Sequence, residues 1–289
     1  MSHRFFCIHD GCYAGIQDRL DSIKRACDQL DVEFVDLDAS KIDYSVIPDP
    51  RRGDMMYNVA RGGEILESIL LTDQLRTFYI NQPALIENNG DTTKYSLLHN
   101  KCKISAPKTI FSINKDRKLL HSAVDYLNSF PLIIKTAGGS KGEGVMVVNG
   151  YPGLFSLVDY LIAKGENFIL REYIEPKEIA RLIVVGNEVV AANSKLIPDD
   201  DFRSCVHDNL PIPKKYSESI ESLAIRASHL ANFENCGVDI LIDENDKGYV
   251  LEVNMPHDFV TTEQATGIDI SSKMVRHLLA KSQTISLLA

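Results

Sequence analysis

Three oxygen-bearing side chains near the end of the chain could hold a metal ion. Glu252 and Asn254 lie two residues apart in Val-Leu-Glu-Val-Asn, so on a strand both side chains point to one face. Asp239, in Gly-Val-Asp-Ile-Leu, lies on the expected partner strand and could add a third oxygen. Oxygen ligands of this kind suit magnesium that is shared with nucleotide phosphates. The alternative is a solvent-exposed acidic face without a metal.

A glycine-rich loop offers a phosphate site. Four glycines lie within the seven residues 138–144, and apolar runs flank the loop on both sides. The loop precedes the apolar run Val145 to Val148 and no helix, so it fits neither a P-loop nor a dinucleotide fingerprint. We expect a flap whose backbone N–H groups, with Ser140 and Lys141, fold over phosphates. The alternative is a flexible turn without a ligand.

Charged side chains elsewhere could bind anions. Lys135 ends the apolar run Leu-Ile-Ile-Lys beside the glycine loop, which predicts an anionic partner such as a phosphate. Arg181 and Arg203 could each bind a phosphate or a carboxylate through two hydrogen bonds. His257 and Asp258 directly follow the expected metal strand and could line a substrate pocket. The alternatives are an edge lysine, surface ion pairs and a structural histidine.

Composition narrows the class of protein. The 289 residues carry 31 basic and 40 acidic side chains, a formal charge of −9, which argues against nucleic acid or an anionic membrane as partner. Hydrophobic residues at 44% and charged ones at 25% are typical of globular proteins with a sizeable core. No apolar run approaches the roughly 20 residues of a membrane span, and charges interrupt the N-terminus too early for a secretory signal. We therefore expect a cytoplasmic protein of two or three domains.

The six cysteines show no paired C-x-x-C spacing that would indicate a zinc site or a redox pair. We expect most of them to be small buried hydrophobic residues in a reducing compartment. They are Cys7, Cys12, Cys27, Cys102, Cys205 and Cys236.

The first ninety residues begin with a β-α-β pattern. Strands are expected at Arg4 to His9 and Val32 to Leu37, around a helix from Ile16 to Leu30. Such a unit favours a parallel sheet with the helix crossing one face. Further elements are expected in this part: a strand at Asp54 to Asn58, a helix at Glu64 to Leu71 and a strand at Thr77 to Ile80.

The remaining chain alternates helices with strands and ends in an antiparallel pattern. Gly186-Asn187 is the turn of an expected hairpin with strands at 180–185 and 188–193. Residues 244–248 form the turn of a second expected hairpin, with strands at 237–242 and 249–254, which carries Asp239 and Glu252. The other expected helices span about 92–101, 115–127, 154–163, 216–233 and 270–279, and the other expected strands 109–112, 130–135, 145–148 and 168–172.

The order of these motifs resembles the ATP-grasp proteins, and its details resemble the RimK-like amino-acid ligases. The similarity is clearest between about Ile169 and Leu279, where segments such as ILREYIEP, DFRS, GVDIL, VLEVN and TGIDISSKMV follow one another with RimK-like spacing. A weaker similarity covers Asn81 to Val148. Where the family continues with small residues after Glu-Val-Asn, this chain has Met-Pro-His-Asp-Phe, which predicts a changed substrate pocket.

The resemblance implies an α/β and α+β architecture, the ATP-grasp fold, with an ATP cleft enclosed by two α+β subdomains. The parts would be an N-terminal β-α domain of the pre-ATP-grasp kind at 1–90, a central subdomain with the flap at 91–172, and a last subdomain with the magnesium site at 173–289. Two magnesium ions are expected, and manganese is the alternative metal.

The resemblance also assigns site residues. Arg203 would act on the transferring phosphoryl group together with Ser204, and Asp239, Glu252 and Asn254 would hold magnesium. His257 and Asp258 lie where this chain departs from the family, so their place at the substrate is expected from their position after the metal strand and not from the resemblance. The expected ATP-binding residues are Lys94, Lys135, Ser140, Lys141, Gly142, Gly144, Glu172, Tyr173, Ile174, Glu178, Arg181 and Ser204.

The implied activity is ATP-dependent ligation of a carboxylate to an amine through an acylphosphate. The expected substrates are amino acids, peptides or the terminus of a carrier protein, and relatives of this kind often form homo-oligomers. Two alternatives stay open, an ATP-grasp kinase of small molecules and a nucleotide-binding protein without turnover. Free phosphate released only with an amine acceptor separates a ligase from a kinase.

Overall fold

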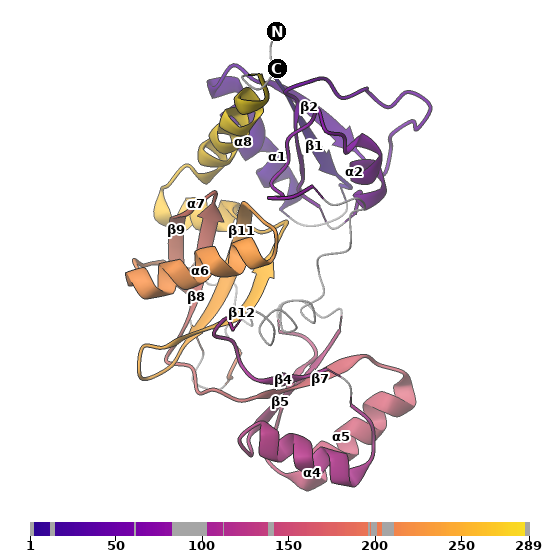
Figure 1. The fold of residues 1–289 in the computed structure, drawn as a ribbon, viewed down its shortest axis with the longest axis vertical. Helices are drawn as coiled ribbons and strands as arrows, with labels where there is room; N and C mark the ends of the chain where they lie inside the picture. Colours follow the sequence, from indigo (N-terminus) through magenta and orange to yellow (C-terminus); the bar gives the residue numbers. More distant parts are fainter. Residues whose placement is uncertain are drawn as a thin grey trace.

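The computed structural model contains three β-sheets arranged along the long axis of the molecule (Figure 1). We name them the N-terminal sheet, the central sheet and the C-terminal sheet, after the order in which the chain forms them. The C-terminal sheet lies between the other two (Figure 1). The structure describes residues 3–11, 15–60, 62–82, 103–111, 113–137, 142–195, 197, 201–203 and 211–286.

The N-terminal sheet confirms the predicted β-α-β opening. Strands β1 (Arg4–His9), β2 (Glu33–Asp38) and β3 (Met55–Asn58) are parallel, in the order β2-β1-β3. Helices α1 (Ile16–Gln29) and α2 (Glu64–Leu70) belong to two separate hydrophobic clusters. Alternate residues of β1 enter these two clusters, as period-2 alternation requires, so the helices cover opposite faces of the sheet.

The strand expected at Thr77 to Ile80 is wrong. Apart from an isolated bridge between Tyr79 and Phe233, this run has no ladder partner among the described residues. Its carbonyl groups at Thr77 and Tyr79 instead accept hydrogen bonds from the side chain of Lys281. An apolar run can therefore be buried at a junction without joining a sheet.

The central sheet is antiparallel, with helices on one face. Its strands are β4 (Thr109–Ile110), β5 (Leu132–Thr136), β6 (Val145–Val148) and β7 (Phe168–Glu172), in the order β4-β7-β5-β6. Helices α4 (Arg117–Tyr126) and α5 (Tyr151–Lys164) share one hydrophobic cluster with Leu132, Ile134 and Leu170. Strand alternation therefore turns Lys135 and Arg171 to the opposite face. The helix expected at 92–101 lies outside the described residues.

The C-terminal sheet confirms both predicted hairpins. Its five antiparallel strands follow the order β10-β9-β8-β11-β12, and β8 pairs with β9 as β11 pairs with β12. Helix α6 (Glu218–Leu230) packs on one face of this sheet through its buried Ile220 and Leu223. The strands are β8 (Glu178–Val185), β9 (Glu188–Lys195), β10 (Ile212–Pro213), β11 (Asn235–Ile242) and β12 (Gly248–Asn254).

The last two helices return the chain to its beginning. Helix α7 (Val260–Thr266) packs against β9, and α8 (Ile270–Ser286) lies beside α1 of the N-terminal part (Figure 1). Buried side chains of α1, α8 and the C-terminal sheet form a single hydrophobic cluster. The N-terminal and C-terminal sheets therefore share one core, whereas the central sheet has its own.

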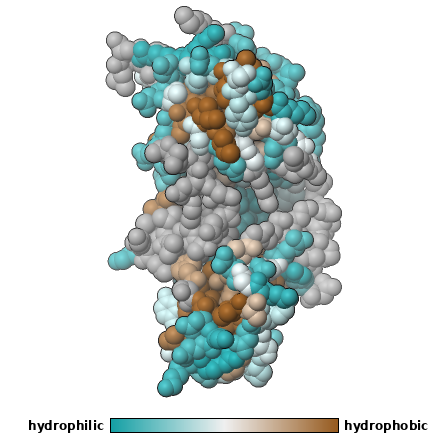
Figure 2. Space-filling model, turned by 90° about the vertical axis from the view of Figure 1, so that its right-hand side faces the viewer, coloured by the Kyte–Doolittle hydropathy of each residue, from teal (hydrophilic) through white to brown (hydrophobic). Residues whose placement is uncertain are grey.

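Three features expected from the composition can be checked in the structure: membrane spans, surface apolar residues and the state of the cysteines. Of the helices in the described parts of the chain, none is sufficiently long and apolar to cross a membrane. Figure 2 shows apolar side chains gathered in two places on one face, one in its upper half and one in its lower half. Large exposed apolar residues include Ile65 and Ile69 of α2. Cys7, Cys27 and Cys236 are free and buried, as expected, and the other three cysteines lie outside the described residues.

Candidate functional site

The β11–β12 hairpin brings the three predicted oxygen-bearing side chains together. Asp239 is the direct partner of Glu252, and Asn254 lies two residues further along β12. The register shifts between Asp239 and Ile240, which is a bulge beside the acidic pair. Asp239 is only 5% exposed, so its carboxylate needs charged or polar partners.

Cationic side chains supply these partners. Arg181 Nε lies 2.9 Å and Lys195 Nζ 3.0 Å from the same oxygen, Oδ1 of Asp239. Lys135 Nζ reaches from the central sheet to within 3.5 Å of Glu252 Oε2. The ion pair between Lys135 and Glu252 therefore connects the central and C-terminal sheets.

Glu252 is held in its ionised form. Burial alone would raise its pKa, but Lys135, the side-chain amide of Asn254 and the two cations beside Asp239 together lower the pKa to about 2. Asn254 Nδ2 donates to Glu252 Oε1 at 2.9 Å. At neutral pH the face therefore presents a carboxylate whose charge is already stabilised.

Arg171 adds a buried charge on the face of the central sheet that lies opposite α4 and α5. Burial lowers the pKa of Arg171 to about 10, and attraction to Glu252 partly offsets this. Its Nε donates to Thr109 Oγ1 at 3.1 Å on the neighbouring strand β4. Among the described residues, the cations Lys135, Arg171, Arg181 and Lys195 thus surround two carboxylates, a local excess of positive charge that suits a polyphosphate.

The described part of the glycine loop lies next to the predicted arginine. Gly142 and Gly144 adopt left-handed conformations, with φ of 79° and 75°. A Cβ on Gly144 would meet Thr136 Oγ1 at 2.0 Å, so only glycine fits there. Arg203 pairs with Asp201 at 2.6 Å and lies 3.4 Å from the carbonyl oxygen of Gly142, to which its Nη1 donates. Lys94, Ser140, Lys141 and Ser204 lie outside the described residues.

The residues expected along the adenine lie where the chain leaves the central sheet. Strand β7 ends at Glu172, and both carboxylate oxygens of Glu172 accept hydrogen bonds from the fold itself. Tyr173 and Ile174 follow, both partly buried. Burial and a hydrogen bond to Glu175 raise the pKa of Tyr173 to about 12, so it stays neutral.

Glu178 and Arg181 lie in strand β8, but their side chains have different partners. Burial would raise the pKa of Glu178, and the hydrogen bonds from Lys214 and Tyr216 outweigh it and lower the pKa. Arg181 instead faces Asp239 on β11. Glu178 and Arg181 were both expected to bind ATP, and for both of them this role stays a prediction.

Comparison with known proteins decides the family. A family model described as RimK-like ATP-grasp domain matches residues 90–278, well over half of the chain. The chain belongs to the RimK-like ATP-grasp family. This confirms the resemblance that the order of motifs indicated.

Curated relatives of this RimK-like chain carry the name probable alpha-L-glutamate ligase. One from Rhodopirellula baltica is 28% identical over 217 residues, which are 72% of this chain and 52% of that protein. Another from Trichodesmium erythraeum is 30% identical over 211 residues, 71% of this chain and 69% of that protein. The chain therefore spans about half of the first relative and about two thirds of the second.

Solved structures show the same fold. The ATP-grasp ligase PsnB, complexed with minimal precursor, superimposes with a TM-score of 0.74 at 14% identity, covering 97% of this chain and 99% of that one. Another PsnB structure holds a phosphomimetic variant of that precursor, Mg and ADP, with a TM-score of 0.73 at 14% identity and coverage of 96% and 98%. The ATP-grasp architecture predicted from the sequence is thereby confirmed.

The two residues expected at the substrate have structural partners in this RimK-like chain. His257 is 2% exposed, and its Nε2 lies 3.0 Å from Asn235 Oδ1. Burial and the nearby charges of Arg181 and Arg19 lower the pKa of His257 to about 3, so the ring is neutral. Asp258 is exposed and accepts hydrogen bonds from the backbone and hydroxyl of Thr261 at the start of α7. A contact of either residue with substrate stays a prediction.

The donor set at the hairpin fits magnesium in kind. Two carboxylates and one side-chain amide offer hard oxygen ligands, and magnesium commonly takes only one or two carboxylates from the protein. The side-chain nitrogen of Asn254 donates a hydrogen bond to Glu252, so the side-chain oxygen of Asn254 can contact a metal. Within the described ranges, no group of three or more acidic, histidine or cysteine side chains forms a metal cluster by itself. The residues therefore fit a metal that takes its remaining ligands from phosphates and water.

Sequence reasoning missed Lys195 as a site residue and gave Arg171 no role. Lys195 was expected beyond the end of its strand, but β9 continues to it and places it near Asp239. The available signal was the alternation of Asn193 and Lys195 at the end of an otherwise apolar strand. A buried arginine in β7 gives no such signal, because its burial depends on the packing of the two sheets.

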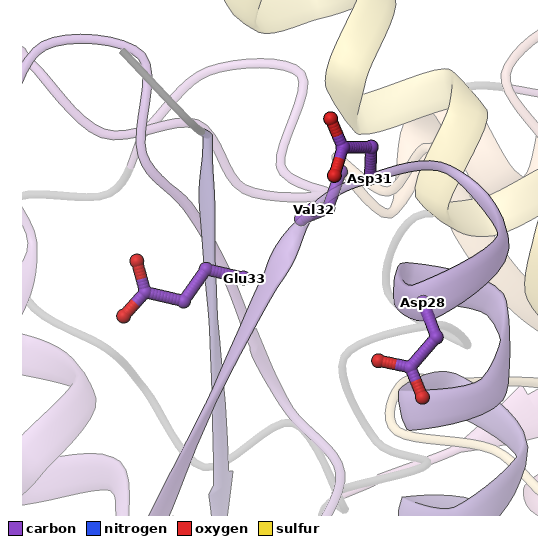
Figure 3. A pocket seen from close by; sticks show the side chains of 4 residues that line it. All are labelled: Asp28, Asp31, Val32 and Glu33. Carbon is purple, nitrogen blue, oxygen red and sulfur yellow. The ribbon is translucent and has the colours of Figure 1, made fainter.

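A separate surface recess lies at the end of α1, away from these residues. Asp28, Asp31, Val32 and Glu33 line it (Figure 3). Figure 3 shows that the three carboxylates point in different directions, so they do not converge on a common ligand.

Proposed function

We propose that this chain is an ATP-dependent ligase that joins a carboxylate to an amine, with the nucleotide bound between the central and C-terminal sheets. The observation that carries the proposal is the convergence of Asp239 and Glu252 with Lys135, Arg181 and Lys195 at the place where these sheets meet. A carboxylate pair surrounded by a larger number of cations is suited to a polyphosphate and its metal.

The side chains divide into phosphate-binding and metal-binding groups. Asp239, Glu252 and Asn254 would hold one or two magnesium ions, and manganese is the alternative. When bound, the metal neutralises charge on the phosphates and so favours transfer. Lys135 would contact the phosphates from the central sheet. The other proposed ATP contacts are Lys94, Ser140, Lys141, Gly142, Gly144, Glu172, Tyr173, Ile174, Glu178, Arg181 and Ser204.

Arg203 is proposed to stabilise the transferring phosphoryl group. It lies beside the glycine loop at Gly142, and its guanidinium can offer two parallel N–H donors to phosphoryl oxygens. In the proposed reaction a substrate carboxylate oxygen attacks the γ-phosphorus and ADP leaves. The amine then attacks the acylphosphate carbon, inorganic phosphate leaves and the amine loses a proton. The chain contributes mainly alignment and charge stabilisation.

The substrates are proposed at the level of chemical class. The glutamate ligase relatives suggest an amino-acid substrate, and the PsnB complexes suggest that a peptide fits the same fold. We therefore propose an amino acid joined to an amine or carboxylate acceptor that is a small molecule, a peptide or the terminus of a carrier protein. Domain boundaries near residues 90 and 172, a cytoplasmic location and a homo-oligomeric state remain part of the proposal.

Product analysis tests the reaction. The protein is mixed with ATP and magnesium and a matrix of amino-acid pairs and short peptides, and both free phosphate and product masses are measured. A ligase releases phosphate only when two substrates are present and yields a mass equal to their sum minus water. A phosphorylated single substrate would instead indicate a kinase. Nucleotide binding without turnover in the whole matrix would favour the binding protein.

A further inference from the structure

Two segments of the chain that belong to no helix or strand cross between the central and C-terminal sheets. The first is residues 103–108, in which Ser105 pairs with β12: its Oγ donates to the Gly248 carbonyl at 2.6 Å, and its own carbonyl accepts from Val250 N at 2.8 Å. The second is residues 173–177, in which Lys177 N donates to the Ile242 carbonyl at 2.9 Å. Both segments, called the crossing segments below, are therefore anchored on the β11–β12 hairpin.

At the central sheet the two crossing segments are joined by Glu172. Its backbone N–H donates to the Lys108 carbonyl at 3.0 Å, and its Oε1 accepts from Lys108 N at 2.7 Å. Its Oε2 accepts from Asn128 Nδ2 at 2.8 Å. Asn128 Oδ1 in turn accepts from Lys108 Nζ at 2.8 Å, which closes a ring of contacts. We call Lys108, Asn128 and Glu172 the hinge clamp.

Asn128 is well suited to its place in the hinge clamp. It follows α4 in a left-handed conformation with φ of 66°, which asparagine adopts more readily than most residues. Its side-chain amide is thereby held at a fixed position beside the end of β7. Asn128 thus connects the end of α4 to both crossing segments, through its hydrogen bonds with Glu172 and Lys108.

Both carboxylate oxygens of Glu172 have hydrogen-bond partners within the hinge clamp. Each carboxylate oxygen already accepts from a donor within the fold. Besides any contact of its own with the nucleotide, Glu172 can therefore act by fixing the backbone that follows it at Tyr173 and Ile174. Hydrogen bonds depend steeply on distance and angle, so a backbone fixed in advance binds a base at lower ordering cost.

We propose that Glu172 is a positioning residue which, through the hinge clamp, holds residues 173–174 as a preset hydrogen-bonding edge for adenine and against guanine. The proposal rests on the proposed function, because it assumes that the nucleotide lies in the cleft. Adenine and guanine present opposite donor and acceptor patterns at the ring nitrogen N1 and its neighbouring exocyclic group. A fixed backbone edge therefore discriminates between them, whereas a loose edge adjusts to either.

Calorimetric titration of the full chain with ADP and with GDP, each in the presence of magnesium, tests the proposal. Glu172→Ala should weaken ADP binding about 10-fold and reduce the ADP-over-GDP preference by a similar factor, since two charge-assisted hydrogen bonds are lost. Glu172→Gln keeps the acceptor for Lys108 N and should give an intermediate value. If turnover is found, the KM for ATP should rise while kcat at saturation changes less than about threefold.

Two further variants keep the experiment interpretable. Asn128→Gly retains the left-handed backbone and removes only the amide, so it should weaken ADP binding about threefold even if Glu172→Ala fails to fold. Asp246→Asn removes an exposed ion pair with Lys177 on the same crossing segment and should leave both affinities within about twofold of the wild type.

The outcomes separate the two proposals. Folded Glu172→Ala and Asn128→Gly variants with wild-type ADP affinity and wild-type base preference would overturn the role of the hinge clamp while leaving the nucleotide site intact. A wild-type chain that binds neither ADP nor GDP would overturn the proposed function, and the hinge clamp proposal with it.

Discussion

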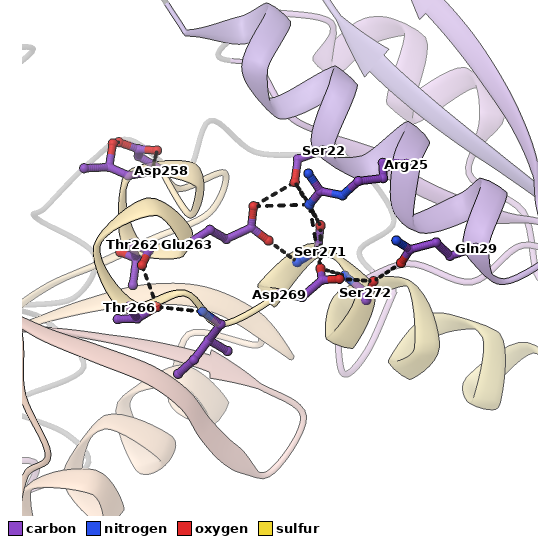
Figure 4. A network of polar contacts seen from close by, with 12 residues as sticks. Ser22, Arg25, Gln29, Asp258, Thr262, Glu263, Thr266, Asp269, Ser271 and Ser272 are labelled. Atoms are coloured by element: carbon purple, nitrogen blue, oxygen red, sulfur yellow. Dashed lines mark hydrogen bonds and ion pairs between the residues drawn. The ribbon is translucent and has the colours of Figure 1, made fainter.

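The C-terminal sheet meets its two neighbours in different ways. Toward the N-terminal sheet it shares a hydrophobic core and a dense set of short polar contacts between α1 and the α7–α8 region (Figure 4). Toward the central sheet the connections are the two crossing segments and longer side-chain contacts, such as Lys135 to Glu252 at 3.5 Å and Arg203 to Gly142 at 3.4 Å. We call these the fixed junction and the hinged junction.

The fixed junction is built from residues far apart in the sequence. Ser22 Oγ of α1 donates to Glu263 Oε2 at 2.7 Å and lies 2.9 Å from Ser271 Oγ (Figure 4). Lys281 Nζ of α8 donates to the carbonyls of Thr77 at 3.1 Å and Tyr79 at 2.7 Å and also pairs with Glu234. Contacts of this density resist opening, because many buried groups would lose their partners at once.

The hinged junction uses the proposed ligand-binding residues as its contacts. Lys135 and Glu252 face each other across it, and both are assigned to the nucleotide and its metal in the proposed function. A bound metal nucleotide would offer each of them a new partner. The comparison therefore teaches that the described polar contacts are dense at one junction and sparse at the other, and we expect ligand-dependent adjustment at the hinged junction.

Replacing Glu252 should have the largest effect on the hinged junction. Glu252→Gln removes a charged oxygen ligand for magnesium, so metal-dependent turnover should fall about 10³-fold. The free energy of unfolding should change by only about 1 kcal/mol, because the ion pair with Lys135 is partly exposed. Phosphate release and urea unfolding measure the two quantities. Glu244→Gln, at an exposed turn of the same hairpin, is the matched control.

Full activity of Glu252→Gln would remove the metal assignment from the hairpin. A large loss of stability in this variant would also contradict the comparison, since it would mean that the hinged junction holds the fold together.

The N-terminal side should lose stability as the pH rises toward 7, whereas the lowered pKa of Glu252 should make the hinged junction lose stability only in acid, below about pH 4.5. Burial raises the pKa of Glu67 to about 7, although hydrogen bonds from Asn58 and Tyr79 oppose this. The folded state therefore binds a proton more tightly than the unfolded state, whose pKa is near 4.5. This stabilisation is fully present below about pH 4.5 and is lost as the pH rises through about 7, by up to about 3 kcal/mol.

Urea unfolding of the wild type and Glu67→Gln between pH 4.5 and 8 measures this contribution. The wild type should lose stability relative to the variant as the pH rises, while Glu166→Gln, at an exposed position far along the chain, should behave like the wild type. Parallel pH profiles of the wild type and Glu67→Gln would show that Glu67 is ionised in the folded protein.

Lys281 at the fixed junction and Lys177 at the hinged junction allow a direct comparison of two lysines. Lys281→Met leaves two carbonyls and the carboxylate of Glu234 without their donor, so the free energy of unfolding should fall by about 2 kcal/mol. Lys177→Met removes an exposed ion pair with Asp246 and should cost less than about 0.5 kcal/mol. Equal losses in urea unfolding would contradict the distinction between the two junctions.

Local pattern was sufficient to predict the metal-binding face. Strand alternation and a short turn fix the β11–β12 pairing, so Asp239, Glu252 and Asn254 could be placed together before the structure was known. The same reasoning identified most helices and strands to within a few residues. The structure extends the last helix, expected to end at Leu279, to Ser286, where sequence gives only a weak boundary.

Contacts between distant elements could not be predicted in this way. Lys195 near Asp239 depends on how β8 and β9 pair with β11, and the bonds of Glu172 to Lys108 and Asn128 depend on how α4 ends beside β7. The return of α8 to α1 likewise depends on packing of the whole chain. Each of these arrangements is decided by tertiary contacts that no single window of sequence contains.

Binding of ADP with magnesium to the wild type and to Lys135→Met tests the central claim most directly. Lys135 is the cation that extends from the central sheet to Glu252 of the C-terminal sheet, so its loss affects the contact between these two sheets and not the fixed junction. We predict that the wild type binds one ADP and that Lys135→Met binds it at least about 10-fold more weakly, with an unchanged midpoint of unfolding in the absence of ligand. Equal ADP affinity in the two proteins would contradict the account and leave Lys135 as an edge lysine without a ligand.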